Sequence, residues 1–499
     1  MPVRRLVTAL ALRLQERSER HVARSLQTSK LRTTLWIVGL GLALVVGGFE
    51  ARANEVTAPA AESASKNKPS TPEDAEYYEL FKTLADTIDQ VDRNYVKDVS
   101  RRELMEAAIR GVLTKLDPYS NYIAPDDVNR FKVTVENQFT GIGIQVELRR
   151  GMLTVITPIV GSPAYKAGVQ AGDVITEIED KSTEGIDLDE AVRRLKGEPG
   201  SSVTFKVQHP GGAGLDKLTV TRELIQMESI RGDTRNDRDQ WNFMLDPDKK
   251  IGYVRILSFG RETQRELKKA LDQLKKENLR GLVLDLRFNP GGLLSAAIEV
   301  ADLFLTEGEI VSTSGRNSPK RSWSAHKPDT YDGFPMAVLV NRASASASEI
   351  VSASLQDHKR AIIVGERTWG KGSVQTVMDL EGGKSMLKLT TASYQRPNGH
   401  NIHRFPDAKE SDEWGVMPDA GYEMKLDDRE FLQLQLYRRD RDILTVNHAA
   451  GQPIAAGEAG KSPPPGGSAS SGQVVSAGFV DRQLQKAVDY LSSELAKAQ

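Results

Sequence analysis

The chain has 499 residues, 39% of them hydrophobic and 27% charged, which is typical of a soluble globular protein of about three domains. The 67 basic and 68 acidic residues leave a formal net charge of -1, so the chain as a whole has no electrostatic attraction for nucleic acid or anionic lipid. The absence of cysteine excludes disulfides, thiolate metal sites and a cysteine nucleophile, and seven histidines leave few candidates for histidine chemistry.

Residues 1–53 have the pattern of an export signal. Basic side chains are spread over residues 1–32, an uncharged apolar run covers Leu35 to Phe49, and the small residues Ala51 and Ala53 follow. Cleavage after Ala53 is favoured over a retained anchor because the run is shorter than the roughly 20 residues that span a bilayer. A tether stays open as the alternative because the basic region is long for a signal. Both readings predict a periplasmic body.

Two segments without periodicity divide the rest of the chain. Residues 54–75 and 451–475 have a composition typical of disordered linkers. Residues 76–130 show helical spacing of apolar side chains and are predicted to form an N-terminal helical region. The last segment, 476–499, carries an apolar helical stripe made of Leu484, Val488, Leu491 and Leu495. The stripe either packs on the body or joins two copies, and the linker before it favours an association helix.

Residues 131–223 read as a small β-rich domain. Short apolar strands are separated by glycines, and Asp187 to Gly197 has helical spacing. The loop that enters the first strand consists of Gly141, Ile142, Gly143 and Ile144. Glycines suit a loop whose N–H groups converge on an anion. This arrangement resembles a bacterial PDZ domain, which binds a peptide as an added strand and holds its terminal carboxylate with loop amides. The loop is therefore the candidate substrate-binding site.

Residues 224–450 alternate strands with helices, as an α/β core does. Three places in this core are candidate sites. The first is the turn SASASE, in which Ser346 stands at the start of a predicted helix. Ser346 and Glu349 have the spacing of a capping box, which needs no catalysis. A serine at a helix N-terminus is also well placed as a nucleophile, because the next amide, Ala347, points at a developing oxyanion.

The second candidate is the segment GERTWGKGSVQ. Gly365 and Gly370-Lys371 have the spacing of a phosphate-binding P-loop, so nucleotide binding is a rival hypothesis. The match fails at Gly372, which stands where a Mg²⁺-binding Ser or Thr is required. The following residues read as a strand that places Lys371, Ser373 and Gln375 on one face, so the Gln375 amide could orient the Lys371 amine. A solvated lysine is the plainer alternative.

The third candidate is DLRFNPGGLL, Asp285 to Leu294, where a strand ends in a glycine-rich turn whose amides could face an anionic intermediate. Other constellations are weaker. His358, His400 and His403 have no carboxylate spacing that marks a triad. The one S-x-x-K pair of the core, Ser385 and Lys388, lies in a predicted strand that points the two side chains to opposite faces.

The motifs LDPYSNYI, DLRFNPGG, VNRASASASEI and GERTWGKGSVQ, together with the PDZ-like insert, stand in one order between Tyr77 and Leu444. In this order the chain resembles the C-terminal processing peptidases, tail-specific serine proteases with a Ser–Lys catalytic pair. The resemblance implies a multidomain α/β fold: a crotonase/ClpP-like protease core with an inserted PDZ domain, N-terminal helices and a C-terminal helix. It also implies that no metal or other cofactor is needed.

The resemblance assigns roles residue by residue. Ser346 is the expected nucleophile, Lys371 the general base and Gln375 the residue that orients the lysine. The oxyanion amides fall on Gly292 and Ala347. Glu349 matches an acidic position of the same motif and is assigned to helix capping. A lysine can act as a base only when it is neutral, so Lys371 has to lose about 3 pKa units by burial.

These residues predict an exported serine endopeptidase that binds C-terminal tails of envelope proteins through its PDZ domain and hydrolyses them by acyl transfer. The implied partners are protein tails, in some family members a lipoprotein adaptor, and a second copy bound through the terminal helices; no nucleic acid is expected. Two alternatives stay open. A non-catalytic PDZ scaffold or chaperone would bind tails without cleavage, and a P-loop-like nucleotide binder would lose ATP on changing Lys371.

Overall fold

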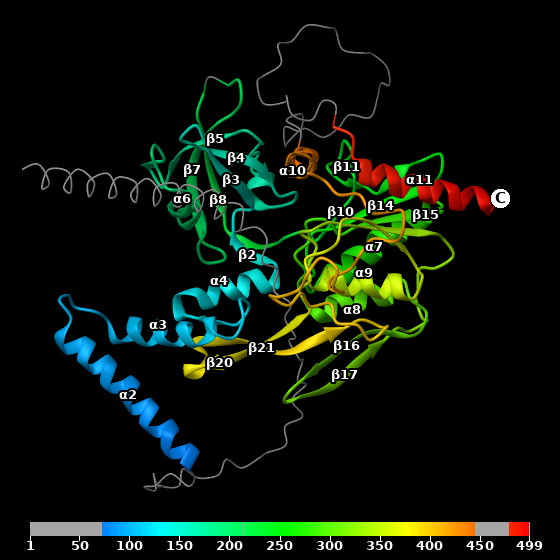
Figure 1. Ribbon diagram of the computed structural model, residues 1–499. Coiled ribbons are helices and arrows are strands. Elements are labelled where there is room, and N and C mark those ends of the chain that lie inside the picture. Colours follow the sequence, from blue (N-terminus) through cyan, green and yellow to red (C-terminus); the bar gives the residue numbers. More distant parts are fainter. Residues whose placement is uncertain (1–71, 213, 445–478, 499) are drawn as a thin grey trace, which may run out of the picture.

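The computed structural model describes residues 72–212, 214–444 and 479–498. The predicted export signal, the second linker and nearly all of the first linker lie outside these ranges. Within them, no helix has both the length and the apolar character needed to cross a membrane. The described chain forms an α/β core, a β-rich domain beside it and a group of N-terminal helices (Figure 1).

The centre of the core is a six-stranded, mostly parallel sheet of order β10-β14-β15-β18-β19, with β13 also paired to β14. The parallel strands are β14 (Ile251–Ile256), β15 (Gly281–Asp285), β18 (Met336–Val340) and β19 (Ile362–Gly365). The antiparallel strands beside β14 are β10 (Ile230–Arg231) and β13 (Met244–Asp246). All residues of β14, β15 and β18 are buried, as expected for a parallel sheet covered on both faces.

Alternate residues of these strands pack on opposite faces of the sheet. Leu284 and Val338 contribute to a core with three helices, whereas Val283 and Leu339 contribute to a core with the C-terminal helix α11 (Arg482–Lys497). The three helices on the first face are α7 (Thr263–Lys276), α8 (Leu294–Asp302) and α9 (Ala347–Asp357). The sheet is thus a middle layer, and its strand ends are fixed from both sides.

The C-terminal helix α11 uses its apolar stripe within its own chain. Leu491 and Leu495 are buried against the sheet, and Leu484 and Val488 pack on the same cluster. The sequence analysis favoured self-association for this stripe, and the structure shows the other reading, packing on the body. The physical reason is the sheet face beneath it, which includes Val283 and other wholly apolar side chains that need a cover.

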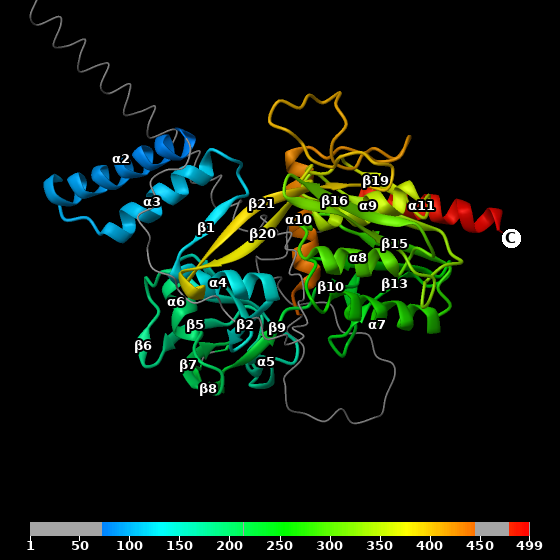
Figure 2. The ribbon, with the colours of Figure 1, turned by 90° about the horizontal axis from the view of Figure 1, so that it is seen from below.

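A second sheet of five strands lies beside the core. Its members are β1 (Asn121–Ile123), β16 (Glu309–Gly315), β17 (Ser318–Ser324), β20 (Ser373–Leu380) and β21 (Ser385–Gln395). The long hairpin formed by β20 and β21 runs from the core to the N-terminal helices, where β1 pairs with β21 (Figures 1 and 2). This hairpin therefore links the motif LDPYSNYI to the segment that begins with Lys371.

The β-rich domain is inserted between β2 (Gln138–Gly141) and β9 (Glu223–Gln226), which pair with each other. Its sheet has the order β3-β4-β5-β7-β8, with β6 beside β5, so β3 is an edge strand. The strands are β3 (Ile144–Arg149), β4 (Met152–Pro158), β5 (Val174–Ile178), β6 (Lys181–Ser182), β7 (Ser202–Gln208) and β8 (Asp216–Thr221), and the helices are α5 (Pro163–Lys166) and α6 (Leu188–Leu195). Val155, Ile175 and Phe205 belong to a core of its own.

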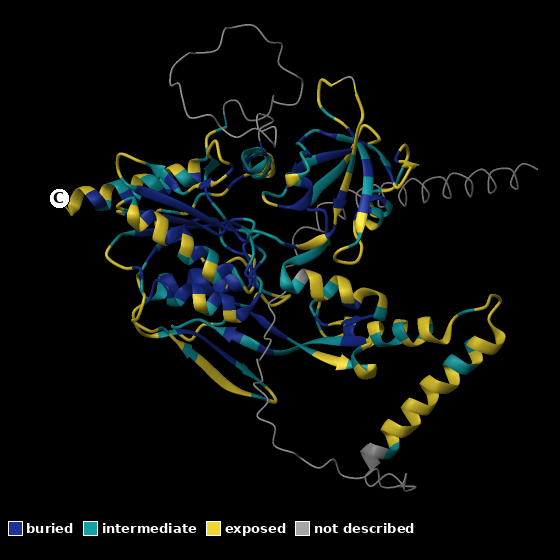
Figure 3. Cartoon of the chain, turned by 180° about the vertical axis from the view of Figure 1, so that it is seen from behind, coloured by how far each residue is buried: buried dark blue, intermediate teal, exposed yellow. Residues whose placement is uncertain are grey.

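The N-terminal helices are α2 (Pro72–Asn94), α3 (Arg101–Thr114) and α4 (Pro125–Glu136). Helix α4 lies next to the hairpin, whereas α2 projects away from the body and is exposed along most of its length (Figure 3). Tyr77, Leu80 and Phe81 on α2 are each more than half exposed. These exposed apolar side chains make α2 a candidate contact surface for another protein.

Candidate active site

The candidate site lies at the carboxyl ends of two neighbouring parallel strands. The loops 286–293 and 341–346 follow β15 and β18, which pair in parallel, so both loops leave the same edge of the sheet. The N–H of Ala345 donates to the carbonyl of Asn289 at 3.0 Å, so the loops contact each other directly. The motifs DLRFNPGG and SASAS, distant in sequence, thus form one site.

The three serines of SASAS have different hydrogen bonds. Ser344 Oγ donates to the carbonyl of Leu286 at 2.8 Å, and Ser348 Oγ donates to the carbonyl of Asn289 at 2.9 Å. Ser346 Oγ is buried and has no hydrogen-bond partner in the described part of the chain. Of the three hydroxyls, only that of Ser346 is left available for chemistry.

The backbone of Ser346 is strained. Its φ of 57° and ψ of -112° are unusual for a residue with a side chain, and it stands directly before the first residue of α9. Such a turn is maintained only when the surroundings hold it. The neighbouring hydroxyl of Tyr394 is fully buried, and this burial raises the pKa of Tyr394, which keeps the phenol protonated.

The side chain of Glu349 holds the turn from inside. Its Oε2 accepts hydrogen bonds from the N–H groups of Ser346 (2.7 Å) and Lys371 (2.8 Å), while Oε1 accepts from the N–H of Gly370 (2.7 Å) and the hydroxyl of Thr368. Burial raises the pKa of Glu349, against the effect of these four donors. Glu349 caps α9, as predicted, and it also brings the backbones of Ser346 and Lys371 to one oxygen atom.

Lys371 lies in a dry environment. Lys371 is only 5% exposed, and its Nζ lies 5.2 Å from the centroid of the Tyr119 ring. Burial lowers the pKa of Lys371 to about 7; the positive charge of Lys388 acts in the same direction, and Glu349 acts against it. The solvated alternative is therefore wrong, because the side chain is buried and burial disfavours its charged form.

Two backbone amides in or beside the turn lack a partner. The N–H groups of Gly292 and Ala347 donate no hydrogen bond within the described residues. Gly291 has a φ of 101°, and a Cβ there would lie 2.8 Å from the Cβ of Ser346, so only glycine lets this loop approach the serine. A Cβ at Gly292 would likewise lie 2.1 Å from the carbonyl oxygen of Phe259. The two predicted oxyanion amides are thus both unpaired.

Gln375 lies on the same strand face as Ser373, as predicted. It is 1% exposed, and its Nε2 donates to Ser373 Oγ (2.9 Å) and to Thr390 Oγ1 (3.2 Å). The N–H of Thr390 in turn donates to Ser120 Oγ at 3.1 Å, and Ser120 Oγ donates to Asp117 at 2.8 Å. The motif LDPYSNYI, which the sequence analysis used only as one of the motifs that carry the resemblance, thereby supports Gln375.

The loop that carries Gly292 is held by a buried ionic network. Arg287, 3% exposed, donates to Asp285 at 2.7 Å and to both oxygens of Asp481 at 2.8 Å. Burial alone would lower the pKa of Arg287, but the two carboxylates raise it well above its usual value. Arg438 of α10 (Asp428–Asp442) also donates to Asp481, at 3.2 Å. The start of α11 therefore supports the loop next to the candidate nucleophile.

The rival constellations are not brought together. The N–H groups of Gly370 and Lys371 point at Glu349, and a strand follows them, so the segment is no phosphate-binding loop. In the described residues, His358 bonds to the carbonyl of Glu309 (2.7 Å) and His400 pairs with a surface glutamate. The ring of His403 lies 6.3 Å from that of Tyr119, and burial lowers its pKa.

The loop of the β-rich domain also presents free amides. The N–H groups of Ile142 and Gly143 donate no hydrogen bond within the described part of the chain, while the Gly143 carbonyl accepts from Ile159 N (2.9 Å) and Ser162 Oγ (3.0 Å). Gly143 has a φ of 80°. Gly141 is paired in β2, and Ile144 begins the edge strand β3. The predicted carboxylate-binding residues thus form one loop at an open sheet edge.

The described ranges contain no cluster of three or more His, Cys, Asp or Glu side chains that could hold a metal ion. The residues that the sequence analysis missed are Tyr119, Ser120, Lys388 and Thr390, all near Lys371 or Gln375. The presence of LDPYSNYI among the ordered motifs was the one signal that pointed to the first two.

The model of peptidase family S41 matches residues 250–420, that of a PDZ domain matches residues 154–209, and that of the "Activating protease CtpB N-terminal domain" matches residues 38–126. The carboxy-terminal-processing protease of Bartonella bacilliformis is 36% identical over 360 residues, which are 70% of this chain and 77% of that protein. The carboxy-terminal processing protease CtpA of Bacillus subtilis is 35% identical over 326 residues, covering 65% and 67%. The solved photosystem II D1 C-terminal processing protease is 31% identical, with 69% and 92% covered and a TM-score of 0.39.

Proposed function

The chain belongs to peptidase family S41 as a carboxy-terminal processing serine protease with a PDZ domain, and from this premise we propose that it cleaves by a Ser346–Lys371 mechanism. The observation that carries the proposal is the turn itself. Ser346 Oγ is the unpartnered hydroxyl of SASAS, the N–H groups of Ala347 and of Gly292 in the adjoining loop are unpaired, and Glu349 joins its backbone to that of a lysine with a pKa of about 7.

In the first step Ser346 Oγ attacks the carbonyl carbon of the scissile peptide bond, and its proton passes to the neutral Nζ of Lys371. The carbonyl oxygen becomes an oxyanion, which the N–H groups of Gly292 and Ala347 stabilise. The C–N bond then breaks, the leaving amine takes the proton from Lys371, and an ester to Ser346 remains. Water attacks this ester with Lys371 again as base, which releases the acid and restores the serine.

Gln375 is proposed to position Lys371. Its Nε2 is held by Ser373 and Thr390, so the amide has a fixed orientation in the same buried region as the lysine. A fixed base matters because a small misplacement of reacting groups lowers rates severely.

The PDZ domain is proposed to bind the C-terminal tail of the substrate. The tail would add a strand to the free edge of β3 and place its carboxylate on the amides of Ile142 and Gly143. The basic and apolar pattern of residues 1–53 supports export to the periplasm, with a membrane tether as the alternative, and hence envelope proteins as substrates.

Two finer expectations remain proposals. The exposed apolar side chains of α2 support association with a second copy or with a lipoprotein adaptor through the N-terminal helices. The mostly parallel sheet covered by helices on both faces supports a crotonase/ClpP-like fold of the core.

The test is degradation of casein, an unstructured protein, by residues 54–499. Ser346→Ala and Lys371→Ala should each lose cleavage while their thermal unfolding stays cooperative. Ser354→Ala is a matched control, because that buried hydroxyl of α9 bonds only to the carbonyl of Val351 and should retain activity. Normal cleavage by Ser346→Ala would refute the nucleophile. Tail binding without cleavage by the wild-type chain would favour the scaffold hypothesis.

A further inference from the structure

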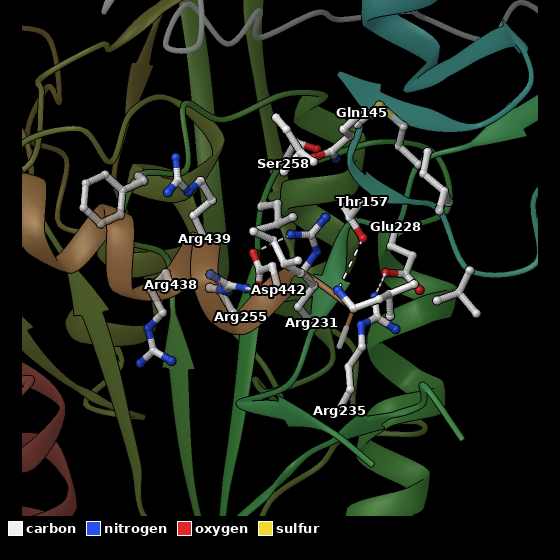
Figure 4. Close-up of a pocket in the computed structure, with 18 of the residues that line it drawn as sticks. Gln145, Thr157, Glu228, Arg231, Arg235, Arg255, Ser258, Arg438, Arg439 and Asp442 are labelled. Carbon is white, nitrogen blue, oxygen red and sulfur yellow. Dashed lines mark hydrogen bonds and ion pairs between the residues drawn. The ribbon is translucent and has the colours of Figure 1, made fainter. Parts of the chain in front are cut away.

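A cavity of about 420 Å³ lies between the PDZ domain and the catalytic core (Figure 4). One wall is formed by the end of β4 and the residues after it, Thr157 to Val160, together with Gln145 of β3. Another wall is formed by Phe288 and Pro290 of the loop that carries Gly292, and a third by α10. The cavity therefore separates the candidate tail-binding loop from the candidate oxyanion loop.

The lining is rich in arginine. Six arginines and three acidic residues contribute to it: Arg231, Arg235, Arg255, Arg287, Arg438 and Arg439, with Glu228, Asp285 and Asp442. Four of the arginines have acidic partners of their own. Arg287 and Arg438 belong to the network around Asp481, Arg235 pairs with Glu228, and Arg439 pairs with Asp440.

The remaining two arginines share one carboxylate. Arg231 and Arg255 both pair with Asp442, each through one of its oxygens. Their side chains are only 17% and 8% exposed, and the Nε atoms of both are buried without a hydrogen-bond partner in the described residues. Figure 4 shows both guanidinium groups close to Asp442 in the cavity. Two buried cations thus face one anion.

An uncompensated buried charge is costly, and an anion that enters the cavity would remove this cost. A guanidinium group is also the side chain best suited to bind a carboxylate, because it offers several N–H donors in a plane. The two guanidinium groups, which line the cavity, can therefore receive a second carboxylate beside Asp442. None of the proposed catalytic steps uses these residues.

The position of the cavity indicates where such a carboxylate comes from. Ile159, in the PDZ wall, donates to the carbonyl of Gly143 in the tail-binding loop, and Pro290 lies two residues before Gly292. A substrate whose C-terminus sits on the PDZ loop and whose scissile bond sits at Ser346 has to pass between these two walls. The occupant of the cavity is then a side chain of the substrate tail.

We propose that this cavity is a specificity subsite in which Arg231 and Arg255 bind the carboxylate of an Asp or Glu that lies between the C-terminus and the scissile bond of the substrate. The proposal rests on the proposed function, because it takes the tail to run from the PDZ loop to Ser346. It names a substrate class: tails with an acidic residue at one fixed distance from their end.

The test compares peptides that carry Glu or Gln at each successive position before a common C-terminus. For the wild-type chain we expect kcat/KM to favour Glu about tenfold at one position, the effect of roughly 1.4 kcal/mol. Arg231→Gln removes the excess charge and should abolish the preference. Asp442→Asn removes the carboxylate that the two arginines share, and should therefore increase the preference for Glu. Arg439→Gln, also in the lining but paired with Asp440 and half exposed, should leave it unchanged.

The ratio of affinities for Glu and Gln peptides is also measured in the Ser346→Ala chain. This measurement tests the cavity without depending on the proposed catalytic mechanism. If Ser346→Ala still cleaves, the proposed function fails while the affinity ratio still tests the cavity. Equal affinities for Glu and Gln peptides at every position, or a preference that both charge variants leave unchanged, would overturn the subsite. Inorganic phosphate should compete with the Glu peptide only; stimulation of both peptides by phosphate would instead make the cavity an effector site and overturn it.

Discussion

Two loops of this protein have unpaired N–H groups that we propose bind an anion, and the two loops are supported in different ways. In the core, the segments that carry Gly292 and Ala347 are each supported by a buried carboxylate: Asp481 pairs with Arg287 of the first, and Glu349 accepts from the N–H of Ser346 in the second. In the PDZ domain, the loop around Gly143 is held by neutral contacts, a backbone bond from Ile159 and the hydroxyl of Ser162.

This difference agrees with the role that we propose for each loop. An oxyanion exists only in the transition state, so its donors stabilise it best when they cannot reorganise. A carboxylate at the end of a peptide is present throughout binding, and a loop that adjusts by a few tenths of an ångström still captures it. Charged, fully buried supports are therefore expected where chemistry occurs, and neutral ones where a tail binds.

Among substitutions that test this difference between the two loops, we expect the largest effect at Glu349. In Glu349→Gln the amide group replaces one carboxylate oxygen and opposes two donors in either orientation, because each oxygen accepts two hydrogen bonds. We expect kcat/KM to fall by at least about 100-fold and the free energy of unfolding to fall by about 3 kcal/mol. Peptide kinetics and denaturant unfolding measure the two effects.

The matched control is Glu366→Gln, which changes another buried carboxylate of the core. Glu366 accepts from the N–H groups of Leu426 and Arg342 and does not bond to Ser346 or Lys371. The Glu366→Gln variant should be less stable than the wild type but should keep the same turnover per folded molecule. Equal turnover in the two variants would show that Glu349 is merely a stabilising residue.

The second effect concerns Asp481. Asparagine caps helices as well as aspartate, so Asp481→Asn keeps the cap on Leu484 N and removes only the charge that Arg287 pairs with. We expect kcat to fall about tenfold with KM unchanged, because a charged hydrogen bond of roughly 1.5–3 kcal/mol behind the oxyanion loop is weakened.

Arg482→Gln is the control for this variant, since it breaks the surface pair with Glu430 at the same end of α11. Turnover is normalised to the number of serines that react with a fluorophosphonate reagent, so unfolded molecules do not count. A normalised kcat equal to that of the wild type would limit Asp481 to a role in stability.

The third effect tests the PDZ loop. A Cβ at Gly143 would lie 2.3 Å from the Cβ of Ser162, and its φ of 80° disfavours a side chain. Gly143→Ala should therefore raise the KM for tail peptides about tenfold, roughly 1.4 kcal/mol, and leave kcat near its normal value. Gly161→Ala carries a similar φ of 77° with open space around it, so it reports backbone strain alone. Equal KM values in both variants would argue against tail binding at this loop.

The smallest effect concerns pH. A neighbouring positive charge disfavours the charged amine, so Lys388 lowers the pKa of Lys371, and Lys388→Gln should raise it above about 7. For the wild type, kcat/KM should rise with pH and level off above about 7. In the variant the rise should shift to higher pH, with activity at pH 6.5 about two- to threefold lower. Lys384→Gln, exposed at the hairpin turn, should keep the normal profile.

Local patterns predicted much of the core, because strands buried on both faces and helices with one apolar face leave clear periodicity. The start of a helix at Ser346 and the strand after Lys371 were both readable in this way. The hydrogen bonds that support the site could not be predicted from local patterns. Glu349 accepts hydrogen bonds mostly from backbone N–H groups, which no sequence pattern distinguishes. Its spacing from Ser346 therefore predicted the helix cap but not its contact with the Lys371 segment.

The position of α11 shows the same limit. Its apolar stripe was visible, but the surface that it covers is assembled from β14, β15 and β18, which no local pattern relates to it. Lys388 illustrates a further case. It was set aside because it cannot pair with Ser385 across a strand, yet its charge acts on Lys371 through space.

The contact between Arg287 and Asp481 joins residues 194 positions apart, and this has a consequence for biosynthesis. A chain that emerges in order acquires its serine, its lysine and its tail-binding domain well before the residue that completes the support of the oxyanion loop. We therefore expect full proteolytic activity only after the C-terminal helix has docked. If the substrates are exposed tails, as we propose, this order of assembly would protect the unfolded part of its own chain from cleavage.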